Sequence, residues 1–200
     1  RIYTEYWQNL AFTVAPTRRQ LKVGSVIDPR TLTVEQKKFG QDGKNLIWSV
    51  AKYNSLSSPI RMASWREAQL IIAEARLGQT AVDRINALRA TYNLPVYRPV
   101  DVNDKSEILA AVLVERGREL FFEGGHRMND LLRYFDANDW QHGLDSQGAP
   151  IFDMYCWPIP DREIQANPDN VNQDMNLERL PSQMNHPTRG VVPKKGWAAY

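Results

Sequence analysis

Three glutamates at helical spacing are the side chains of this sequence with the clearest chemical potential. Glu115, Glu119 and Glu123 recur at every fourth position, so a helix would place them on one face. Two carboxyl groups about 5–9.5 Å apart can act as acid and base in glycoside hydrolysis. His126 follows closely in the sequence. The pattern is therefore compatible with a glycosidase active site.

Arginines surround the same glutamates and favour a different role. A guanidinium fork can bridge two carboxylates and hold them ionised, whereas a general acid needs a raised pKa. We therefore predict a structural network of ion pairs between helices, and no enzyme active site. Its predicted members are Glu115, Arg116, Glu119, Glu123, Arg127, Asp130 and Arg133.

Thiol and imidazole groups are sparse. Cys156 is the only cysteine, which excludes an internal disulfide and a zinc site built from paired thiolates. We interpret it as a buried small apolar residue. The three histidines, His126, His142 and His186, lie too far apart in the sequence for a local metal motif. We predict no metal and no cofactor.

The composition excludes further classes of protein. The chain has 25 Lys and Arg against 23 Asp and Glu, and no basic run exceeds two residues. A nucleic-acid-binding protein would carry a concentrated basic surplus, so we predict no nucleic-acid partner. No stretch approaches the ~18 apolar residues of a membrane span. With 42% hydrophobic and 24% charged residues, the chain has the composition of a folded globular protein.

Four helices are expected to position the charged residues. Apolar residues recur at helical spacing from Met62, with Trp65 on the buried stripe and Gly78 at the end. Thr80 and Ser106 are the predicted caps of the second and third helices. Short connections imply antiparallel neighbours, so we expect two helical hairpins stacked in a tetratricopeptide-like layout. The predicted helical stretches are 62–75, 80–92, 106–120 and 128–135.

We predict that the remaining segments have mostly irregular secondary structure. The fold class is therefore mainly α, with stacked antiparallel helix pairs, long irregular Pro-rich segments and a few short strands. Residues 141–200 are expected to be extended and packed on the core, with one short helix at 161–165. We divide the chain into an irregular segment 1–60, a helical core 61–140 and the Pro/Gly-rich segment 141–200. The predicted strands are Leu10 to Val14, Leu21 to Ile27 and Leu46 to Val50.

Three blocks of sequence together resemble the SusD/RagB family. Residues 115–133 read E-R-x-x-E-L-x-x-E-G-G-H-R-x-x-D-L-x-R, with two glycines where the family usually has one. Upstream, residues 66–75 and 85–89 resemble the helical pair R-x-x-E/Q-L…A-E-A…I-N-x-x-R. Downstream, W-P-I-P-D-R-E-I at 157–164, then N-P and Gln173, resemble the family's ending, although Asp174 replaces a common Asn. Three blocks in family order are far more specific than one.

The resemblance implies a non-enzymatic lipoprotein on the surface of the outer membrane. Such a protein binds oligosaccharides or peptides and covers a TonB-dependent transporter. Family members are much longer, so we expect this chain to be part of a larger protein; Cys156 is internal and cannot be the family's lipid-bearing cysteine. The alternative is a non-catalytic scaffold subunit of a membrane complex, on its periplasmic side, that reuses the helical core.

Aromatic residues with polar neighbours are the candidate ligand contacts. Sugar rings stack their C–H faces on indole and phenol rings while their hydroxyls bind amide and charged side chains. For any single tryptophan, packing is the commoner role, and we assign Trp65 and Trp157 to packing. The predicted ligand-binding residues are Trp140 with Asn138, then Trp48 and Tyr53, then Trp7.

Overall fold

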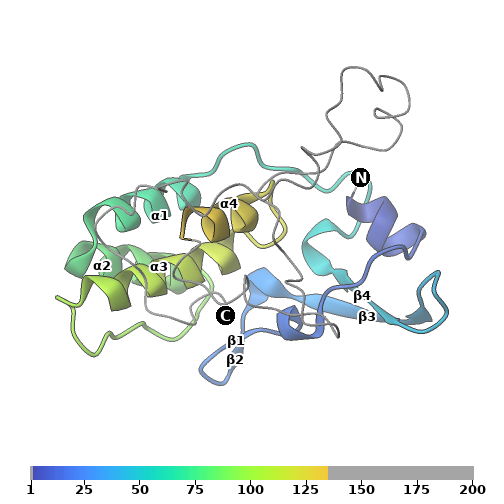
Figure 1. Ribbon diagram of the computed structural model, residues 1–200, viewed down its shortest axis with the longest axis horizontal. Helices are drawn as coiled ribbons and strands as arrows, with labels where there is room; N and C mark the ends of the chain where they lie inside the picture. Colours follow the sequence, from blue (N-terminus) through green and yellow to red (C-terminus); the bar gives the residue numbers. More distant parts are fainter. Residues whose placement is uncertain (1, 135–200) are drawn as a thin grey trace, which may run out of the picture.

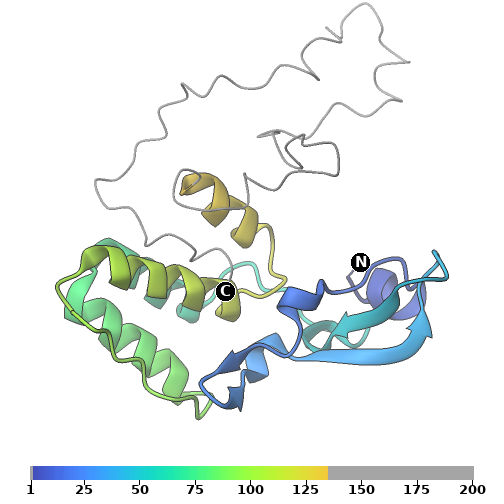
Figure 2. The ribbon, with the colours of Figure 1, turned by 60° about the horizontal axis from the view of Figure 1, so that its bottom comes forward.

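The computed structural model describes residues 2–134 of the 200-residue chain. Within that range the chain forms a strand-bearing part, up to about residue 53, and a helical part from residue 65 onward (Figure 1). The two parts lie side by side in both views (Figure 2). The described fold is mainly helical with a few short strands, which confirms the predicted fold class. The predicted helix at 161–165 lies outside the described residues, and the division into three segments remains a prediction.

The strand-bearing part is built from short elements. Its longest strands pair antiparallel, with Thr33 opposite Val50 and Glu35 opposite Trp48, before an irregularity shifts the register. In chain order the elements are the π-helix η1 (Thr4–Gln8), the 3-10 helix η2 (Pro16–Arg18), β1 (Lys22–Val23), β2 (Val26–Ile27), the 3-10 helix η3 (Pro29–Thr31), β3 (Thr33–Phe39), β4 (Leu46–Val50) and the 3-10 helix η4 (Ala51–Tyr53).

The strand predictions had mixed outcomes. The stretch from Leu46 to Val50 is a strand, as predicted, whereas its partner β3 was not predicted. The stretch from Leu21 to Ile27 is a tight hairpin of β1 and β2 that turns at Gly24, where φ is 60°. The prediction of a strand from Leu10 to Val14 was wrong. There, the side chain of Thr13 accepts the Trp48 N–H at 2.8 Å in place of a backbone carbonyl, so no regular ladder forms.

Four α-helices follow, and their start positions depend on local capping. Helix α1 starts after Ser64, whose hydroxyl accepts the Glu67 N–H at 3.1 Å, so Met62 lies outside the helix and is 94% exposed. The carboxylate of Asp104, not Ser106, caps α3 by accepting two backbone N–H groups. The helices are α1 (Trp65–Arg76), α2 (Gly78–Ala90), α3 (Lys105–Glu119) and α4 (His126–Arg133).

The predicted cap at Thr80 was also wrong, because the chain reverses earlier. Leu77 has a φ of 54° and alone separates α1 from α2, so α2 begins at Gly78 without a side-chain cap. This single-residue connection makes α1 and α2 antiparallel neighbours, as expected.

Helices α2 and α3 run in the same direction. The segment 91–104 carries the chain back, so that Gly78 at the start of α2 lies near Val102 and Arg89 near its end binds Glu115 near the end of α3 (Figure 1). Helix α4 returns against α3, because Asp130 pairs with Arg116. The two predicted hairpins therefore exist as antiparallel pairs, but a parallel contact joins them. The tetratricopeptide-like stacking remains a prediction.

The helical core is formed by aliphatic residues of α1, α2 and α3. Helix α1 contributes Leu70 and Ala73, both fully buried. Trp65, which we expected in the core, is 52% exposed, and Arg66 lies over its ring at 5.2 Å. The reason is that α1 packs on α2 and α3 through the stripe of Leu70 and Ala73, which turns Trp65 and Ile71 outward. The main cluster of buried residues is Ala73, Ala81, Val82, Ile85, Ile108 and Val112.

Candidate functional site

The charged centre of the molecule starts from a local turn. Asp28 precedes Pro29 and caps η3 by accepting the Arg30 N–H at 3.0 Å. The same carboxylate receives the Arg30 side chain through two bonds, Nε to Oδ1 at 2.9 Å and Nη2 to Oδ2 at 2.7 Å. This bidentate pair fixes the guanidinium and directs its remaining nitrogen toward α3.

Arg30 then binds two of the predicted glutamates. Its Nη1 donates to Glu115 Oε1 at 2.6 Å and to Glu119 Oε2 at 3.2 Å. The side chains of all three are at most 2% exposed. Arg89 from α2 occupies the other oxygen of Glu115 at 2.9 Å, and the Tyr92 hydroxyl donates to Glu119 Oε1 at 2.9 Å. One guanidinium from the strand-bearing part therefore joins η3 to α3, and Glu115 extends the link to α2 through Arg89.

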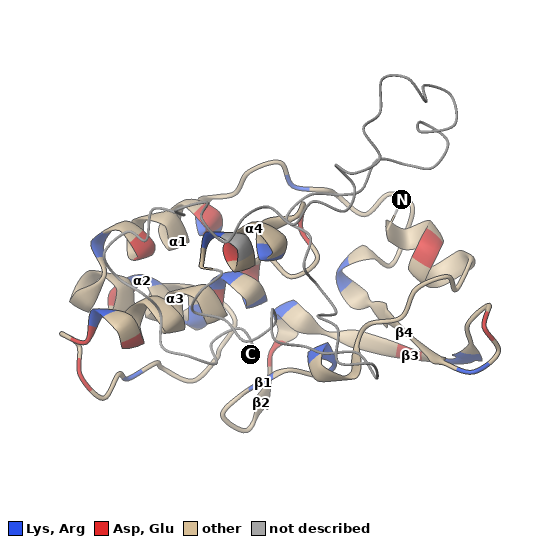
Figure 3. Ribbon diagram, viewed as in Figure 1, with Lys and Arg blue, Asp and Glu red and all other residues tan. Residues whose placement is uncertain are grey.

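A second group of ion pairs holds α4 in place. Asp130 on α4 accepts hydrogen bonds from Arg116 at 3.0 Å and from Arg133 at 2.6 Å. Arg133 also donates to both oxygens of Glu74 on α1, and the Tyr134 hydroxyl donates to the same carboxylate at 2.9 Å. These contacts tie α1, α3 and α4 together, and oppositely charged segments lie next to one another where these helices meet (Figure 3).

The remaining predicted network members lie at the end of α3. The Glu123 carboxylate accepts a hydrogen bond from Lys52 of η4. The Arg127 guanidinium lies beside Gly117 of α3, since a Cβ on that glycine would be 3.5 Å from Arg127 Nη1. Burial, and then the charge of Arg18, lower the pKa of Arg127 to about 10. The structure thus places the seven predicted residues along α3, the turn that follows it and α4.

The electrostatics of the network suit structure better than acid catalysis. Burial by itself would raise the pKa of Asp28, but the hydrogen bonds and charge of Arg30 lower it below its usual value. Glu74 behaves in the same way, with Arg133 as the partner that lowers its pKa. Held ionised in this way, Asp28 and Glu74 cannot donate a proton to a leaving group near neutral pH. Tyr92, by contrast, has its pKa raised to about 12, first by burial and then by Glu119.

Three of the five predicted ligand-binding residues meet around β4. The indole N–H of Trp7 donates to the Val50 carbonyl at 3.2 Å. Trp48 is half-buried, and the Arg19 guanidinium lies over its ring at 5.2 Å. Tyr53 is only 3% exposed and packs with Val50 in a hydrophobic cluster, so its ring offers little open face. Trp140 and Asn138 lie outside the described residues.

Several network residues were missed from the sequence. Asp28, Arg30 and Lys52 lie in the segment that we expected to be irregular, and we made no prediction for them. The Asp-Pro-Arg triplet is typical only of a capped turn. Nothing in its local pattern indicates a partner on α3. Arg66 and Arg89 belong to the blocks that carried the family resemblance, and the structure adds their partners, Glu119 at 3.5 Å and Glu115.

The described residues contain neither a membrane-spanning helix nor a metal-binding cluster. No helix there is long and apolar enough to cross a lipid bilayer. Within residues 2–134, no group of three or more His, Cys, Asp or Glu side chains could hold a metal ion.

Comparison with known proteins identifies the family. The model of the SusD family (SusD/RagB) matches residues 34–148, which is more than half of the chain. The chain belongs to the SusD family. The match begins in β3 and includes all four helices with the ion pairs between them. Searches of curated proteins and of solved structures gave no match.

Membership of the SusD family defines the general role. Proteins of this family are nutrient-binding proteins associated with the outer membrane, and they are generally non-catalytic. The ion network agrees with that role, because it uses its carboxylates to join helices. Its members from Glu115 to Arg133 lie within the matched range.

Proposed function

We propose that this SusD-family protein binds a glycan, or alternatively a peptide, at the cell surface and passes it to a TonB-dependent transporter of the SusC type. The observation that carries the proposal is the family match over residues 34–148. The rigid ion network supports it, because a binding surface on short loops needs a firm scaffold beneath it.

The aromatic cluster at β4 is the described region best suited to a sugar. Trp7 and Trp48 are each half-buried, so each leaves part of an indole uncovered. Asn45 and Asn54 are exposed and lie close to β4 in the sequence. Their side-chain amides can form hydrogen bonds with the hydroxyl groups of a sugar. We propose that Trp48 and Trp7 contribute to the ligand site together with Trp140 and Asn138, and that Trp140 provides the principal stacking surface. Tyr53 would contribute from below, because it belongs to the buried cluster against which Trp48 packs.

The cellular location follows from the same proposal. We infer a lipoprotein anchored at the outer surface of the outer membrane, where it can meet large nutrients before the transporter does. The alternative location is the periplasmic side of a membrane complex. A protease added to intact cells distinguishes the two, because only a surface-exposed protein would be digested.

A scaffold role is the second candidate, and one observation favours it. Helix α1 exposes an apolar face on which Trp65 is 52% and Ile71 54% exposed, with Ile72 beside them at 37%. Apolar helix faces of this kind mark protein contacts. In this alternative the SusD-like core is a structural subunit of a membrane complex and binds no nutrient.

Calorimetric titration of the full chain distinguishes the two candidates. The probes are maltoheptaose, cellohexaose, chitotetraose and tetra-alanine, measured against wild type, Trp140→Ala and Trp48→Ala. Trp65→Ala is the matched control, because it removes an exposed indole that we place outside the ligand site. We expect one probe to bind, with affinity reduced at least tenfold in the first two variants and unchanged in the control.

The opposite result would support the scaffold. It would consist of no heat with any probe, together with co-purification of an outer-membrane transporter that a Trp65→Gln/Ile72→Gln double variant abolishes. Loss of affinity in Trp65→Ala alone would instead place the ligand on α1 and contradict the assignment to Trp140 and Trp48.

A further inference from the structure

The half-buried indole of Trp48 carries a guanidinium group on its surface. Arg19 follows η2 in an extended conformation, and its Cζ lies 5.2 Å from the centroid of the Trp48 ring. Its side chain donates to the Val14 carbonyl at 2.7 Å and to the Thr13 hydroxyl at 3.4 Å. Within residues 2–134 it forms no ion pair, whereas Arg30 binds three carboxylates. Arg19 is therefore held at the aromatic cluster by neutral groups.

The neighbouring backbone explains why this side chain is fixed. The Thr13 hydroxyl donates to the Leu46 carbonyl at 3.0 Å and accepts the Trp48 N–H at 2.8 Å. The Val14 N–H donates to the Trp48 carbonyl at 2.9 Å. Residues 13 and 14 are thus attached to the edge of β4, and Arg19 donates to both of them. A ligand that approaches Trp48 would meet a guanidinium that is already oriented, so little freedom would be lost on binding.

One edge of the Arg19 guanidinium remains available. A guanidinium has five N–H groups, and the bonds to Val14 and Thr13 use Nε and one N–H of Nη2. Both N–H groups of Nη1 and the second one of Nη2 have no acceptor in the described part of the chain. Two neighbouring N–H groups on such an edge match the two oxygens of a carboxylate.

The charges of the strand-bearing part favour an anionic ligand. Residues 2–53 carry eight Lys and Arg against four Asp and Glu. Of these four carboxylates, that of Asp28 is buried with Arg30, and that of Asp42 accepts backbone N–H groups of its own turn. The exposed lysines that form no ion pair with a described residue are Lys22, Lys37, Lys38 and Lys44. The potential around β3 and β4 is therefore positive.

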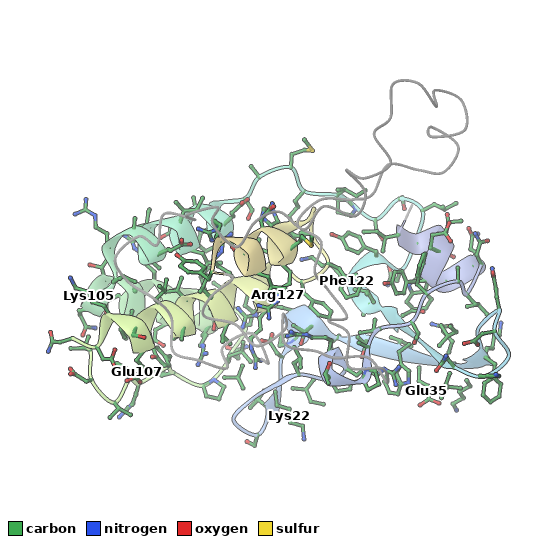
Figure 4. The ribbon with its side chains drawn as sticks, in the orientation of Figure 1. Lys22, Glu35, Lys105, Glu107, Phe122 and Arg127 are labelled. Atoms are coloured by element: carbon green, nitrogen blue, oxygen red, sulfur yellow. The ribbon has the colours of Figure 1, made fainter. Side chains whose placement is uncertain are left out.

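Glu35 is the acidic residue that such a ligand would meet. It lies opposite Trp48 in the β3–β4 pair, and side chains of opposite residues in antiparallel strands share a face. Figure 4 labels it on the strand-bearing part, well apart from Lys105 and Glu107 of α3. Glu35 is exposed, and no described residue forms an ion pair with it. Its charge would repel a ligand carboxylate at Arg19, so its removal should have the opposite effect to removal of Arg19.

We propose that the aromatic site at β4 prefers a glycan that contains uronic acid, with the carboxylate of one sugar bound to the Nη1–Nη2 edge of Arg19 beside Trp48. This inference rests on the proposed glycan function and names the substrate class of the same site. The indoles of Trp48 and Trp7 favour a sugar as the body that carries the carboxylate, because they offer flat apolar surface to its C–H faces. A neutral glycan would lack the contact with Arg19 and would bind more weakly.

Titration calorimetry of the full chain with tetragalacturonate tests the preference. The ligand control is the fully methyl-esterified tetrasaccharide, which has the same sugar rings without the charges. We expect wild type to bind the acid at least tenfold more tightly than the ester. Higher salt should weaken binding of the acid and leave that of the ester unchanged, since salt screens the charge attraction alone.

Four variants assign the preference to Arg19. We expect the affinity for the acid to fall at least tenfold in Arg19→Gln, to fall less in Arg19→Lys, and to rise at least twofold in Glu35→Gln. Arg84→Gln is the protein control, because Arg84 is also half-buried and donates to a neutral group, Gln69 Oε1 at 2.7 Å, but lies on α2. It should stay within twofold of wild type. Unchanged affinity of Arg19→Gln for the ester would show that this variant keeps its fold and its aromatic contacts.

The outcomes separate this inference from the proposed function. If the ester or a neutral oligosaccharide binds wild type as tightly as the acid, the inference is overturned and the glycan function stands. If neither the acid nor any uncharged oligosaccharide binds, both are overturned. Equal affinities of Arg19→Gln and Arg84→Gln for the acid would overturn the assignment to Arg19. Tighter binding of tetraglutamate than of tetragalacturonate, with the same dependence on Arg19, would assign the site to an acidic peptide and overturn the inference.

Discussion

Arg30 and Glu115 lie 85 positions apart in the sequence, yet Arg30 Nη1 donates to Glu115 Oε1 at 2.6 Å in a site shielded from water. Asp28 fixes the other edge of the same guanidinium. This pair joins the strand-bearing part of the molecule to α3. Because Asp28, Glu115 and Glu119 share this buried guanidinium, loss of its charge would leave three buried carboxylates short of positive charge.

Removal of the Arg30 charge should therefore weaken the whole domain. We expect Arg30→Met to lower the free energy of unfolding by about 3–5 kcal/mol, because the buried carboxylates of Asp28 and Glu115 would lose the guanidinium that they share. Arg30→Lys should recover only part of this loss, since an ammonium cannot reproduce the two-sided fork. Urea denaturation measures both, and Arg98→Met at an exposed position is the control, with an expected change within about 0.5 kcal/mol. Equal midpoints for the Arg30 and Arg98 variants would contradict the prediction.

Glu119→Gln separates a structural carboxylate from a catalytic one. Glu119 accepts from Tyr92 and from Arg30. The amide would leave the Arg30 charge partly unmatched, so we expect a loss of about 3–5 kcal/mol in the free energy of unfolding. We expect no hydrolysis of chromogenic glycosides by wild type or variant. Hydrolysis by wild type that disappears in a stably folded Glu119→Gln variant would restore the glycosidase interpretation.

Acidification should destabilise the fold through Asp28 and Glu74. Their pKa values are lowered in the folded protein. Their stabilising contribution is therefore present above the unfolded carboxyl pKa of about 4 and is lost as the pH falls through the folded values. Urea denaturation between pH 7 and pH 3 should show a fall that begins near pH 4. Asp28→Asn should be less stable at pH 7 and should show a shallower fall, and a steeper one would contradict the assignment.

Two glycines near the start of α4 should respond in opposite directions to the same substitution. Gly117 lies inside α3, and a Cβ there would meet Arg127 Nη1 at an ordinary contact distance of 3.5 Å. Gly117→Ala should therefore raise the free energy of unfolding by about 0.5–1 kcal/mol through helix propensity. Gly125 has a φ of 78°, so Gly125→Ala should lower it by about 1–2 kcal/mol. Thermal unfolding of the pair measures both, and equal signs would contradict this account.

The helical part was largely predictable because its signals are local. Apolar spacing placed all four helices, and the mixture of Glu, Asp and Arg in residues 115–133 indicated ion pairing within that segment. The errors lie at the ends. Asp104 is preferred to Ser106 as a cap because its carboxylate accepts two N–H groups, and Leu77 starts α2 early by reversing the chain within one residue.

Periodicity did not indicate how α1 is rotated. Its apolar residues cover more than one face, so Trp65 and Leu70 both fit a helical stripe. Packing on α2 and α3 buried Leu70 and left Trp65 exposed. The partners that the network finds outside residues 115–133 were also not predictable. A pairing such as Arg30 with Glu115 depends on tertiary structure, and local spacing in the sequence does not indicate it.

The distance between Arg30 and Glu115 along the chain has a consequence during synthesis. At about 5–20 residues per second, a ribosome needs roughly 4–17 seconds to add the intervening residues. Throughout that interval the guanidinium has only Asp28 beside it and must stay hydrated. The strand-bearing part therefore cannot close around this charge when it emerges. It has to wait for α3, and the two parts should complete their folding in a single late step.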